Sequence, residues 1–241
     1  GVATMPAHIR TPMTISLKGI SSMATRQVLA DLCVEHRARC GVQVDFESVG
    51  GVDAARRVQA GEAFDIVVLG SDAIDKLIAS GHLQAGSRTD IVTSSVAACV
   101  PSGAAVPDLS TEAGLRQALD AAGRIGFSTG PSGVALQKLF QRWGIDQAMA
   151  AKTVQAPPGV PVASLVARGD IALGFQQLSE LLHVPGITIV RHWPASVPIV
   201  TTFSAGVPAG TPHATAVQAL LAWLTSPDAD AAKRRQGMEP A

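Results

Sequence analysis

Short apolar runs alternate with longer amphipathic segments along the whole chain. The apolar runs have the pattern of strands: MTISL, VQVDF, FDIVVLG, VAACVP, RIGFS, IALGF and ITIVRHW. The segments between them are rich in Ala, Leu, Gln and Arg, and their apolar residues recur at helical spacing. This alternation predicts an α/β fold in which doubly wound, largely parallel sheets are flanked by helices.

The predicted helices begin at small polar residues and end near glycines. Ser, Thr and Asp side chains accept hydrogen bonds from the free N–H groups of a first helical turn, and glycine readily takes the left-handed conformation that ends a helix. We therefore expect a first helix that begins at Ser21 or Ser22, and further helices over 53–59, 71–80, 132–143 and 215–225.

Two β-like regions have no helix beside them, one near 91–99 and one near 192–202. They bracket a middle segment, as two chain crossings around an inserted lobe would. We therefore expect a first lobe built from 1–93 and 198–241 and a second lobe built from 94–197. One large sheet is the alternative, which periodicity alone does not exclude.

The composition is that of a soluble globular protein. The 241 residues are 47% apolar and 16% charged, and 19 basic residues balance 19 acidic ones. There is no overall field to attract nucleic acid or a membrane surface, so a charged ligand must be caught by local arrangement. No apolar run reaches the length of a membrane span, and the start GVATMPAHIR has no signal-peptide core.

Signatures of catalysis and of metal binding are weak. Cys33, Cys40 and Cys99 have no metal-ligand spacing, and free thiols are the simplest expectation. A bridge between Cys33 and Cys40 would require their helix to end before Gly41, because seven helical residues rise roughly 10 Å. The six histidines are scattered, and the chain has no nucleophile elbow, phosphate loop or dinucleotide motif. We therefore expect no cofactor and no metal.

Four joints recur where a β-like run ends and small or polar residues open a helix: SLKGISS, SVGGVD, LGSDA and FSTGPSGVA. Ligands of open α/β sheets collect at such ends, where helix N-termini and backbone amides converge. In the first joint Lys18 would supply a cation, Gly19 a close backbone approach and Ser21 a hydroxyl. In the second, Gly50 and Gly51 would let backbone N–H groups approach an anion.

The later part of the chain offers matching polar groups. The fourth joint contains Ser128, Gly130 and Ser132, and the run IALGF is followed by Gln176 and Gln177 at a strand end. Amides and hydroxyls there can donate to ligand oxygens. Each joint taken alone is equally compatible with an ordinary turn and helix cap, and the two amides with satisfying backbone groups. Arg56 and Arg57 lie too far into their helix for both to face its N-terminus, and salt bridges are the simpler role.

From Met13 to Pro240 the chain resembles the periplasmic molybdate-binding proteins of ABC importers, which have the type II solute-binding fold. The resemblance rests on the opening strand and its serine-containing turn, followed in order by four segments: VDAARRVQAGEAFDIVVLGSDAIDKLIASG, PSGVALQKLFQRWG, SLVARGDIALGF and GMEP. It implies two α/β lobes joined by two hinge strands and closing on an oxyanion. It also implies a monomeric periplasmic or secreted protein, without its removed signal peptide, that delivers its ligand to an ABC permease.

Relatives hold the anion through backbone N–H groups and hydroxyls at the same joints. Carried over by position, the resemblance places first-lobe ligands near Ser21 and at Gly51. It places second-lobe ligands at Ser132, near Val160 and at Gln177.

The departures from the family pattern concern the ligand. Molybdate-binding relatives usually have a tyrosine where this chain has Gln177, and this chain contains no tyrosine. Gly50 and Gly51 replace a serine-rich turn, and Lys18 adds a cation that an uncharged cage does not need. A cation beside glycines favours an organic carboxylate or polycarboxylate, because charge-assisted hydrogen bonds are strong.

Three functions follow from the resemblance and its departures. The first is a binding protein that captures an organic polycarboxylate for ABC import, with no nucleic-acid partner and no membrane insertion. The second is an isomerase, because some proteins of this family are similar to a periplasmic aconitate isomerase. That chemistry needs a general base, for which Lys18, Glu47 and Asp53 are all possible. The third is a molybdate or tungstate receptor.

Overall fold

The computed structural model describes residues 15–157 and 159–241; the segment GVATMPAHIR and the start of the predicted strand MTISL lie outside them. The first part of the chain alternates strands and helices as predicted. Its elements are β1 (Ser16–Ser22), η1 (Met23–Thr25), α1 (Arg26–Cys40), β2 (Gln43–Val49), α2 (Gly51–Gln59), β3 (Ile66–Gly70) and α3 (Ser71–Ala79).

A long strand, β4 (Thr89–Pro101), leads from this part into the next. The middle of the chain forms α4 (Glu112–Ala121), β5 (Ile125–Phe127), α5 (Pro131–Arg142), α6 (Asp146–Ala150), α7 (Val162–Ala167), β6 (Leu173–Gln177), α8 (Leu178–Leu181) and β7 (Ile187–Val190). The chain returns through β8 (Val200–Gly206) and continues as α9 (Ala214–Leu224), η2 (Pro227–Ala229), α10 (Asp230–Arg235) and β9 (Met238–Pro240).

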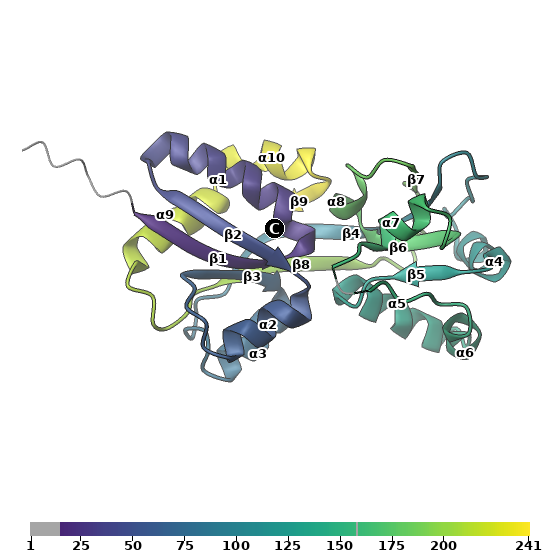
Figure 1. Ribbon diagram of the computed structural model, residues 1–241, viewed down its shortest axis with the longest axis horizontal. Coiled ribbons are helices and arrows are strands. Elements are labelled where there is room, and N and C mark those ends of the chain that lie inside the picture. Colours follow the sequence, from purple (N-terminus) through teal and green to yellow (C-terminus); the bar gives the residue numbers. More distant parts are fainter. Residues whose placement is uncertain (1–14, 158) are drawn as a thin grey trace, which may run out of the picture.

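Two antiparallel strands, β4 and β8, connect the two halves of the molecule (Figure 1). The strand order is β2-β1-β3-β8-β4-β6-β5, with parallel pairs β1/β2, β1/β3 and β5/β6. Along β4 the partners change: residues from Thr89 to Ser95 pair with β8, and residues from Val96 onward pair with β6 and β7. We call the part with β1–β3 lobe 1 and the part with β5–β7 lobe 2.

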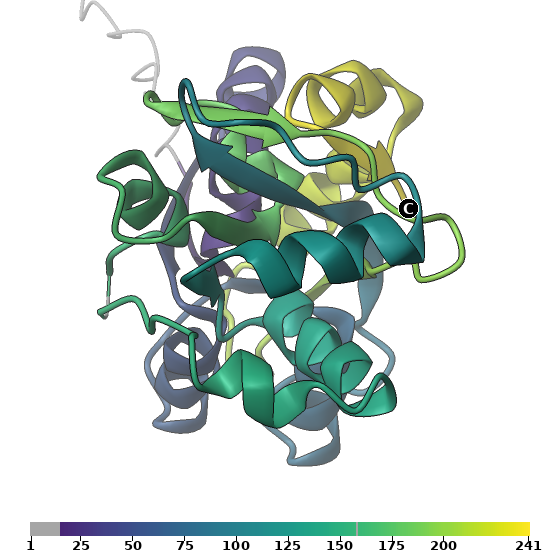
Figure 2. The same ribbon diagram turned by 90° about the vertical axis from the view of Figure 1, so that its right-hand side faces the viewer.

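Each lobe has its own hydrophobic core on both faces of its sheet. In lobe 1, Leu17 of β1 packs into a cluster with α1 and α9, whereas Ile20 packs into a cluster with α2 and α3. In lobe 2, Ala98 and Cys99 of β4 likewise point into different clusters. No cluster in the described ranges mixes the two lobes, although hydrogen bonding through β4 is continuous. Figure 2 looks from the lobe 2 end, with teal and green elements in front.

The molecule is thus a two-lobe, type II binding fold with two hinge strands, as the sequence predicted. Two boundaries differ from expectation. The segment SLKGISS is strand throughout rather than a joint, so the first joint begins after Ser22. The second hinge strand begins at Val200, and 191–199 form no strand. The predicted limits of the lobes, 1–93 with 198–241 and 94–197, stay a proposal, and the change of partners at Ser95 and Val96 lies close to one of them.

Candidate functional site

The carboxyl ends of the parallel strands of both lobes meet at the junction between the lobes. In Figure 1 the arrowhead of β2 points towards lobe 2. Helices follow directly at these ends: α2 begins one residue after β2, α3 directly after β3, and α8 directly after β6. Their first N–H groups have no partner within the helix, so the junction collects donors and the positive ends of helix dipoles.

Ser21 and Ser22 end β1 at this junction. Ser21 is fully buried; its hydroxyl donates to the backbone oxygen of Ser22 over 3.0 Å and lies 2.8 Å from the hydroxyl of Ser48 at the end of β2. Ser22 is buried as well, and among the described residues its Oγ atom has no hydrogen-bond partner. Because unpaired buried polar atoms are costly, Ser22 has capacity for a further hydrogen bond.

Gly50 and Gly51 form an open approach to the start of α2. Gly50 is the N-cap of α2. A Cβ atom at Gly51 would meet nothing within 4 Å, and one at Gly50 would meet only Oδ2 of Asp53, at 3.9 Å. The glycines are therefore not required by packing inside the chain, and they leave space in front of the helix N-terminus.

Lys18 does not lie at this joint. It belongs to the middle of β1, and its amino group lies 3.6 Å from a carboxylate oxygen of Glu62 and 4.9 Å from the ring centre of Phe64. The prediction that Lys18 supplies the cation for an anion was based on ending the strand too early. An exposed surface ion pair accounts for its position instead.

Gly19 also has a structural reason unrelated to a ligand. It is buried in β1, and a Cβ atom there would overlap the ring of Phe46 on the neighbouring strand. No side chain fits without moving that ring. The close backbone approach that the sequence predicted is therefore an approach to Phe46.

Glu47 and Asp53, the two acidic candidates for a general base, both pair with arginine side chains. Arg57 makes two hydrogen bonds to Glu47, at 2.7 and 2.8 Å, and these hold the pKa of Glu47 below its usual range. Asp53 lies 3.3 Å from Arg56 on the exposed side of α2. Arg56 and Arg57 thus form the surface salt bridges expected from the sequence, and the lowered pKa of Glu47 makes it a poor base near neutral pH.

In lobe 2, the start of α5 brings three predicted residues together. Gly130 is the N-cap of the helix and Ser132 is buried in its first turn. The hydroxyl of Ser128 lies 3.3 Å from that of Ser132. A Cβ atom at Gly130 would meet only the Ser128 hydroxyl, at 3.6 Å. This joint is a second polar helix start, on the opposite lobe.

Gln177 lies on the hinge, with polar groups of both hinge strands on the same face of the sheet. Its Nε2 atom donates to Oγ1 of Thr201 over 3.0 Å, and Thr201 lies opposite Ser94 in the β4/β8 ladder. Gln177 itself lies opposite Val96, two residues from Ser94, which puts all these side chains on one face. In the described residues, Oε1 of Gln177 and Oγ of Ser94 are buried without a partner.

Gln176 and Val160 make their contacts within lobe 2. Oε1 of Gln176 accepts a hydrogen bond from the backbone N–H of Ala163 at the start of α7, 3.2 Å away. Val160 is half-buried and packs against the hydrophobic cluster that contains Leu165. Of the two adjacent amides, Gln177 has a buried atom without a partner among the described residues.

The lobes touch at two further places around the junction. A Cβ atom at Gly70, at the end of β3, would lie 3.0 Å from Cγ of Pro131, at the start of α5. On the other side of the hinge, the hydroxyl of Ser179 in α8 donates to the backbone oxygen of Ala24 in η1 over 2.8 Å. The polar groups described above lie at the ends of the same elements.

Two charged residues at the junction were missed from the sequence. Arg26 is the first residue of α1, whose first turn contains no acidic residue, and no ion pair to it is found among the described residues. A cation at a helix N-terminus is unfavourable unless an anion lies nearby. Glu180, the third residue of α8, has its pKa raised to about 7 by burial, with the backbone N–H of Gln177 acting in the opposite direction.

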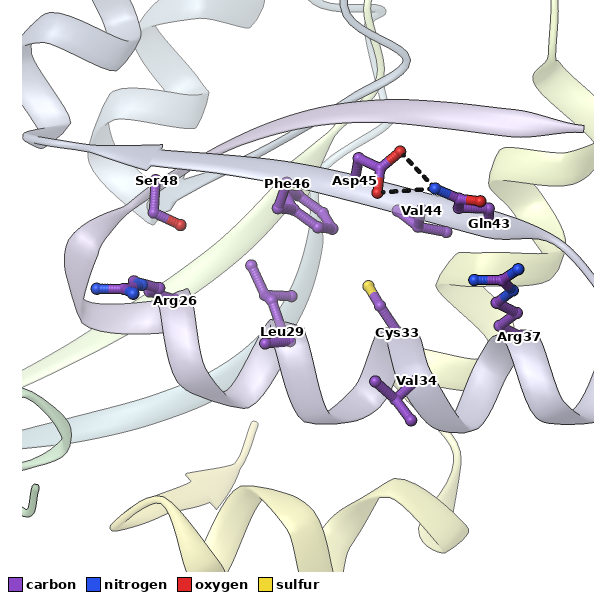
Figure 3. Close-up of a pocket in the computed structure, with 11 residues that line it drawn as sticks. Arg26, Leu29, Cys33, Val34, Arg37, Gln43, Val44, Asp45, Phe46 and Ser48 are labelled. Atoms are coloured by element: carbon purple, nitrogen blue, oxygen red, sulfur yellow. Dashed lines mark hydrogen bonds between the residues drawn. The ribbon is translucent and has the colours of Figure 1, made fainter.

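A groove of about 350 Å³ runs between α1 and β2. Figure 3 shows Arg26 beside Ser48 at one end of it and Arg37 at the opposite end. The thiol of Cys33 lines the groove, and burial, together with the charge of Asp45, raises its pKa to about 12, so it is a poor nucleophile. Cys33, Cys40 and Cys99 are all free, and α1 continues to Cys40, which rules out a bridge between the first two.

In the described part of the chain, no helix is long and apolar enough to cross a membrane. Within the same residues, no group of three or more His, Cys, Asp and Glu side chains could hold a metal ion.

Known proteins resemble the chain over almost its whole length. It is 35% identical to an aconitate isomerase of Pseudomonas sp over an alignment of 245 positions, covering 99% of this chain and 93% of that protein. A periplasmic molybdate-binding protein of Azotobacter vinelandii has a similar structure, with a TM-score of 0.76 and 21% identity over 92% of this chain and 98% of that one.

A sulfate-binding protein of Mycobacterium tuberculosis has a TM-score of 0.77 and 15% identity, over 94% of this chain and 87% of its own. The sequence profile of one family, described as bacterial extracellular solute-binding protein, matches residues 17–239. The chain belongs to this family of bacterial extracellular solute-binding proteins.

Proposed function

We propose that the chain binds a small polycarboxylate of the aconitate class between its lobes and interconverts the isomers of that acid. The observation that carries this proposal is the similarity to an aconitate isomerase, 35% identical over 99% of the chain. A match of that extent includes both lobes, both hinge strands and every joint described above. The more distant molybdate- and sulfate-binding structures support the fold only.

The charge at the junction favours a carboxylate over a tetrahedral metal oxyanion. Arg26 lies at the N-terminus of α1, where the helix dipole is unfavourable for a cation. The hydrogen-bonded hydroxyls of Ser21 and Ser48 and the unpaired hydroxyl of Ser22 lie at the ends of the neighbouring strands β1 and β2. A planar guanidinium can bind both oxygens of one carboxylate. In this proposal Arg26 takes the role that the sequence assigned to Lys18.

The hinge can supply further donors to the ligand. If the amide of Gln177 is turned over, its oxygen accepts from the hydroxyl of Thr201 and its NH2 group takes the position of the unpaired atom. The amide then donates to an anion. Ser94, with an unpaired buried hydroxyl on the same face, is a second donor in reach of a bound ligand.

The space at the helix starts is suited to a ligand larger than molybdate. The chain has no tyrosine, and Gly51 and Gly130 leave the starts of α2 and α5 free of side-chain atoms. The proposed ligand site consists of Ser21, Gly50, Gly51, Ser128, Gly130, Ser132 and Gln177, with Arg26, Ser94 and Thr201 in addition.

The reaction is a shift of one proton and one double bond. A C–H bond of the substrate's methylene carbon breaks, the double bond moves by one position, and a C–H bond forms at the other end of the three-carbon unit. No electron is gained or lost overall. The intermediate carries extra negative charge on its carboxylates, and Arg26 and the helix N-termini would stabilise that charge.

A transport receptor is the second candidate, and membership of the extracellular solute-binding family favours it. In that role the periplasmic, monomeric protein would close on a polycarboxylate and present the closed form to an ABC permease. Binding and closure would be coupled, because only the closed form brings the polar groups of both lobes onto the same anion.

One experiment separates these functions. The protein is incubated with cis-aconitate in D2O and followed by proton NMR, while thermal shifts are recorded with cis-aconitate, trans-aconitate, citrate, molybdate, tungstate and sulfate. We expect stabilisation by the aconitates and the appearance of the trans isomer with deuterium at the methylene carbon. Stabilisation without conversion would support the transport receptor, and stabilisation by molybdate or tungstate alone would overturn both carboxylate proposals.

A further inference from the structure

The short helix α8 crosses from lobe 2 to lobe 1 at the junction. It begins directly after Gln177, the hinge residue with an unpaired amide oxygen. Its Ser179 donates to the backbone oxygen of Ala24 in lobe 1 over 2.8 Å. Its Leu178 would lie 3.0 Å from a Cβ atom at Gly237, which belongs to the C-terminal part of lobe 1. The helix is therefore held from both sides of the hinge.

The backbone N–H of Gln177 donates a hydrogen bond to the Glu180 carboxylate, which therefore lies back at the start of α8, beside the hinge. The contacts of the neighbouring residues show which side of α8 is left for Glu180. Leu178 and Leu182 share the face towards Gly237, Leu181 packs into a core cluster of lobe 2, and Ser179 faces η1. At about 100° per residue, the side of the helix that remains lies opposite Leu178, between Ser179 and Leu181. Glu180 occupies that side; it is half-buried and makes no ion pair within the described part of the chain.

The surroundings of Glu180 contain few charges. Of the elements packed against α8, η1 and β6 carry no titratable side chain. β4 carries two: Asp90, bonded to Arg88 and Ser204, and Cys99, buried in the core cluster that also contains Leu181.

Further along the chain, His183 bonds to Gln236, and Lys233 of α10 is buried, which lowers its pKa. Burial therefore dominates at Glu180, raising its pKa to about 7. A general base is most effective when its pKa lies near the working pH.

We infer that Glu180 is the residue that moves the proton in the proposed isomerisation. Its carboxylate removes a proton from the methylene carbon of the bound acid, and the carboxylic acid so formed exchanges its proton with solvent. It then donates a proton, or a deuteron in D2O, to the other end of the allylic unit. Glu180 is unchanged at the end of the cycle, and a single group suffices because both carbons belong to one three-carbon unit. The inference rests on the proposed function and adds the residue that performs it.

The test compares Glu180→Gln with the wild-type protein and with Glu112→Gln. Glu112 also lies in the first turn of a lobe 2 helix, α4, which Figure 1 shows at the end of lobe 2 remote from the junction. Binding of cis-aconitate is measured by calorimetry and conversion by NMR. We expect Glu180→Gln to bind within about threefold of wild type and to lose about 100-fold or more of conversion and deuterium exchange. Glu112→Gln should match wild type in both.

The outcomes separate the two levels of the proposal. A wild-type protein that binds aconitate without conversion overturns the proposed isomerisation, and the role of Glu180 with it. An active wild type with a Glu180→Gln variant of similar rate overturns the role of Glu180 alone.

If that variant does not fold, the wild-type pH profile decides. We expect kcat/KM to fall as the pH drops through about 7, because Glu180 becomes protonated, and a rate that is flat from about pH 5.5 to 8 contradicts the inference.

Discussion

Gly70 at the end of β3 faces Pro131 at the start of α5, so that a Cβ atom at Gly70 would lie 3.0 Å from Cγ of Pro131. The backbone of Gly70, with φ −52° and ψ 142°, suits any L residue. A side chain at this position therefore acts on the contact between the lobes and not on the local backbone.

We expect Gly70→Val to hold the lobes apart. Ligand binding should weaken by about 1–3 kcal/mol, the usual effect of overpacking, because the two helix starts no longer reach one anion. Calorimetry gives the affinity and X-ray scattering the radius of gyration, which should increase. Gly123→Val is the matched control, since a Cβ atom there meets nothing within 4 Å. Unchanged affinity and radius in Gly70→Val would contradict closure at this contact.

Arg26 and Lys18 should differ sharply in their effect on ligand binding. We expect Arg26→Ala to weaken carboxylate binding by about 1.5–3 kcal/mol, because a charged hydrogen-bond partner is lost. Lys18→Ala should leave the affinity unchanged, because Lys18 pairs with Glu62. Arg37→Ala removes the arginine at the far end of the same groove and is the control. Equal losses in all three variants would mean a general charge effect instead of a site at Arg26.

The fit between Gly19 and Phe46 predicts a loss of stability without a loss of binding. Gly19→Ala places a methyl group against the Phe46 ring and should lower the free energy of unfolding by about 1–3 kcal/mol. Urea unfolding measures the change. In a protein that already carries Phe46→Leu, Gly19→Ala should lower the free energy of unfolding by less, because the ring is absent. Additive effects of the two substitutions would show that the ring is not what excludes a side chain at Gly19.

Glu180 should make the protein less stable as the pH rises towards neutrality. Its folded-state pKa, about 7, lies above the ordinary value of 4.5. The folded state therefore binds the proton more tightly, and this contribution to the free energy of unfolding is present below about pH 4.5 and is lost as the pH rises through about 7. In Glu180→Gln this part of the pH dependence should disappear. Urea unfolding from pH 4.5 to 8 measures it, and parallel curves for the variant and wild type would exclude the raised pKa.

The sequence predicts those features that depend on local chemistry. Gly50 and Gly130 precede helices in the structure as expected, because turn preferences act over a few residues. The expected serine caps are wrong: no side chain caps α2, α3 or α5, and α1 begins at Arg26 instead of Ser21 or Ser22. The alternation of apolar segments predicted the α/β class, whereas the two lobes were predicted from the two β-like regions without a helix and from the family resemblance. Lys18 and Gly19 were misplaced because the strand continues to Ser22 through a sequence, LKGISS, that is rich in turn-forming residues. Pairing with β2 on one side and β3 on the other keeps it extended.

The remaining features of the site depend on contacts between distant segments. Ser94 and Thr201 are polar residues within strands, and only the β4/β8 register shows that they lie opposite one another. Arg26 is a candidate ligand-binding residue because no acidic residue lies in its helical turn and because Ser48 lies near it (Figure 3). The raised pKa of Glu180 depends on its burial where the lobes are in contact. No local pattern encodes such relationships.

The last strand, β9, pairs with residues Val92–Ser94 of β4, the strand that enters lobe 2. Lobe 1 therefore includes both the first strand and the last strand of the described chain, whereas lobe 2 is made of one continuous stretch between them. During synthesis lobe 2 has its complete sequence well before residue 240 is added, but lobe 1 does not. A chain that stops before β9 would lack the strand that completes the lobe 1 sheet and would leave an unpaired edge on β4.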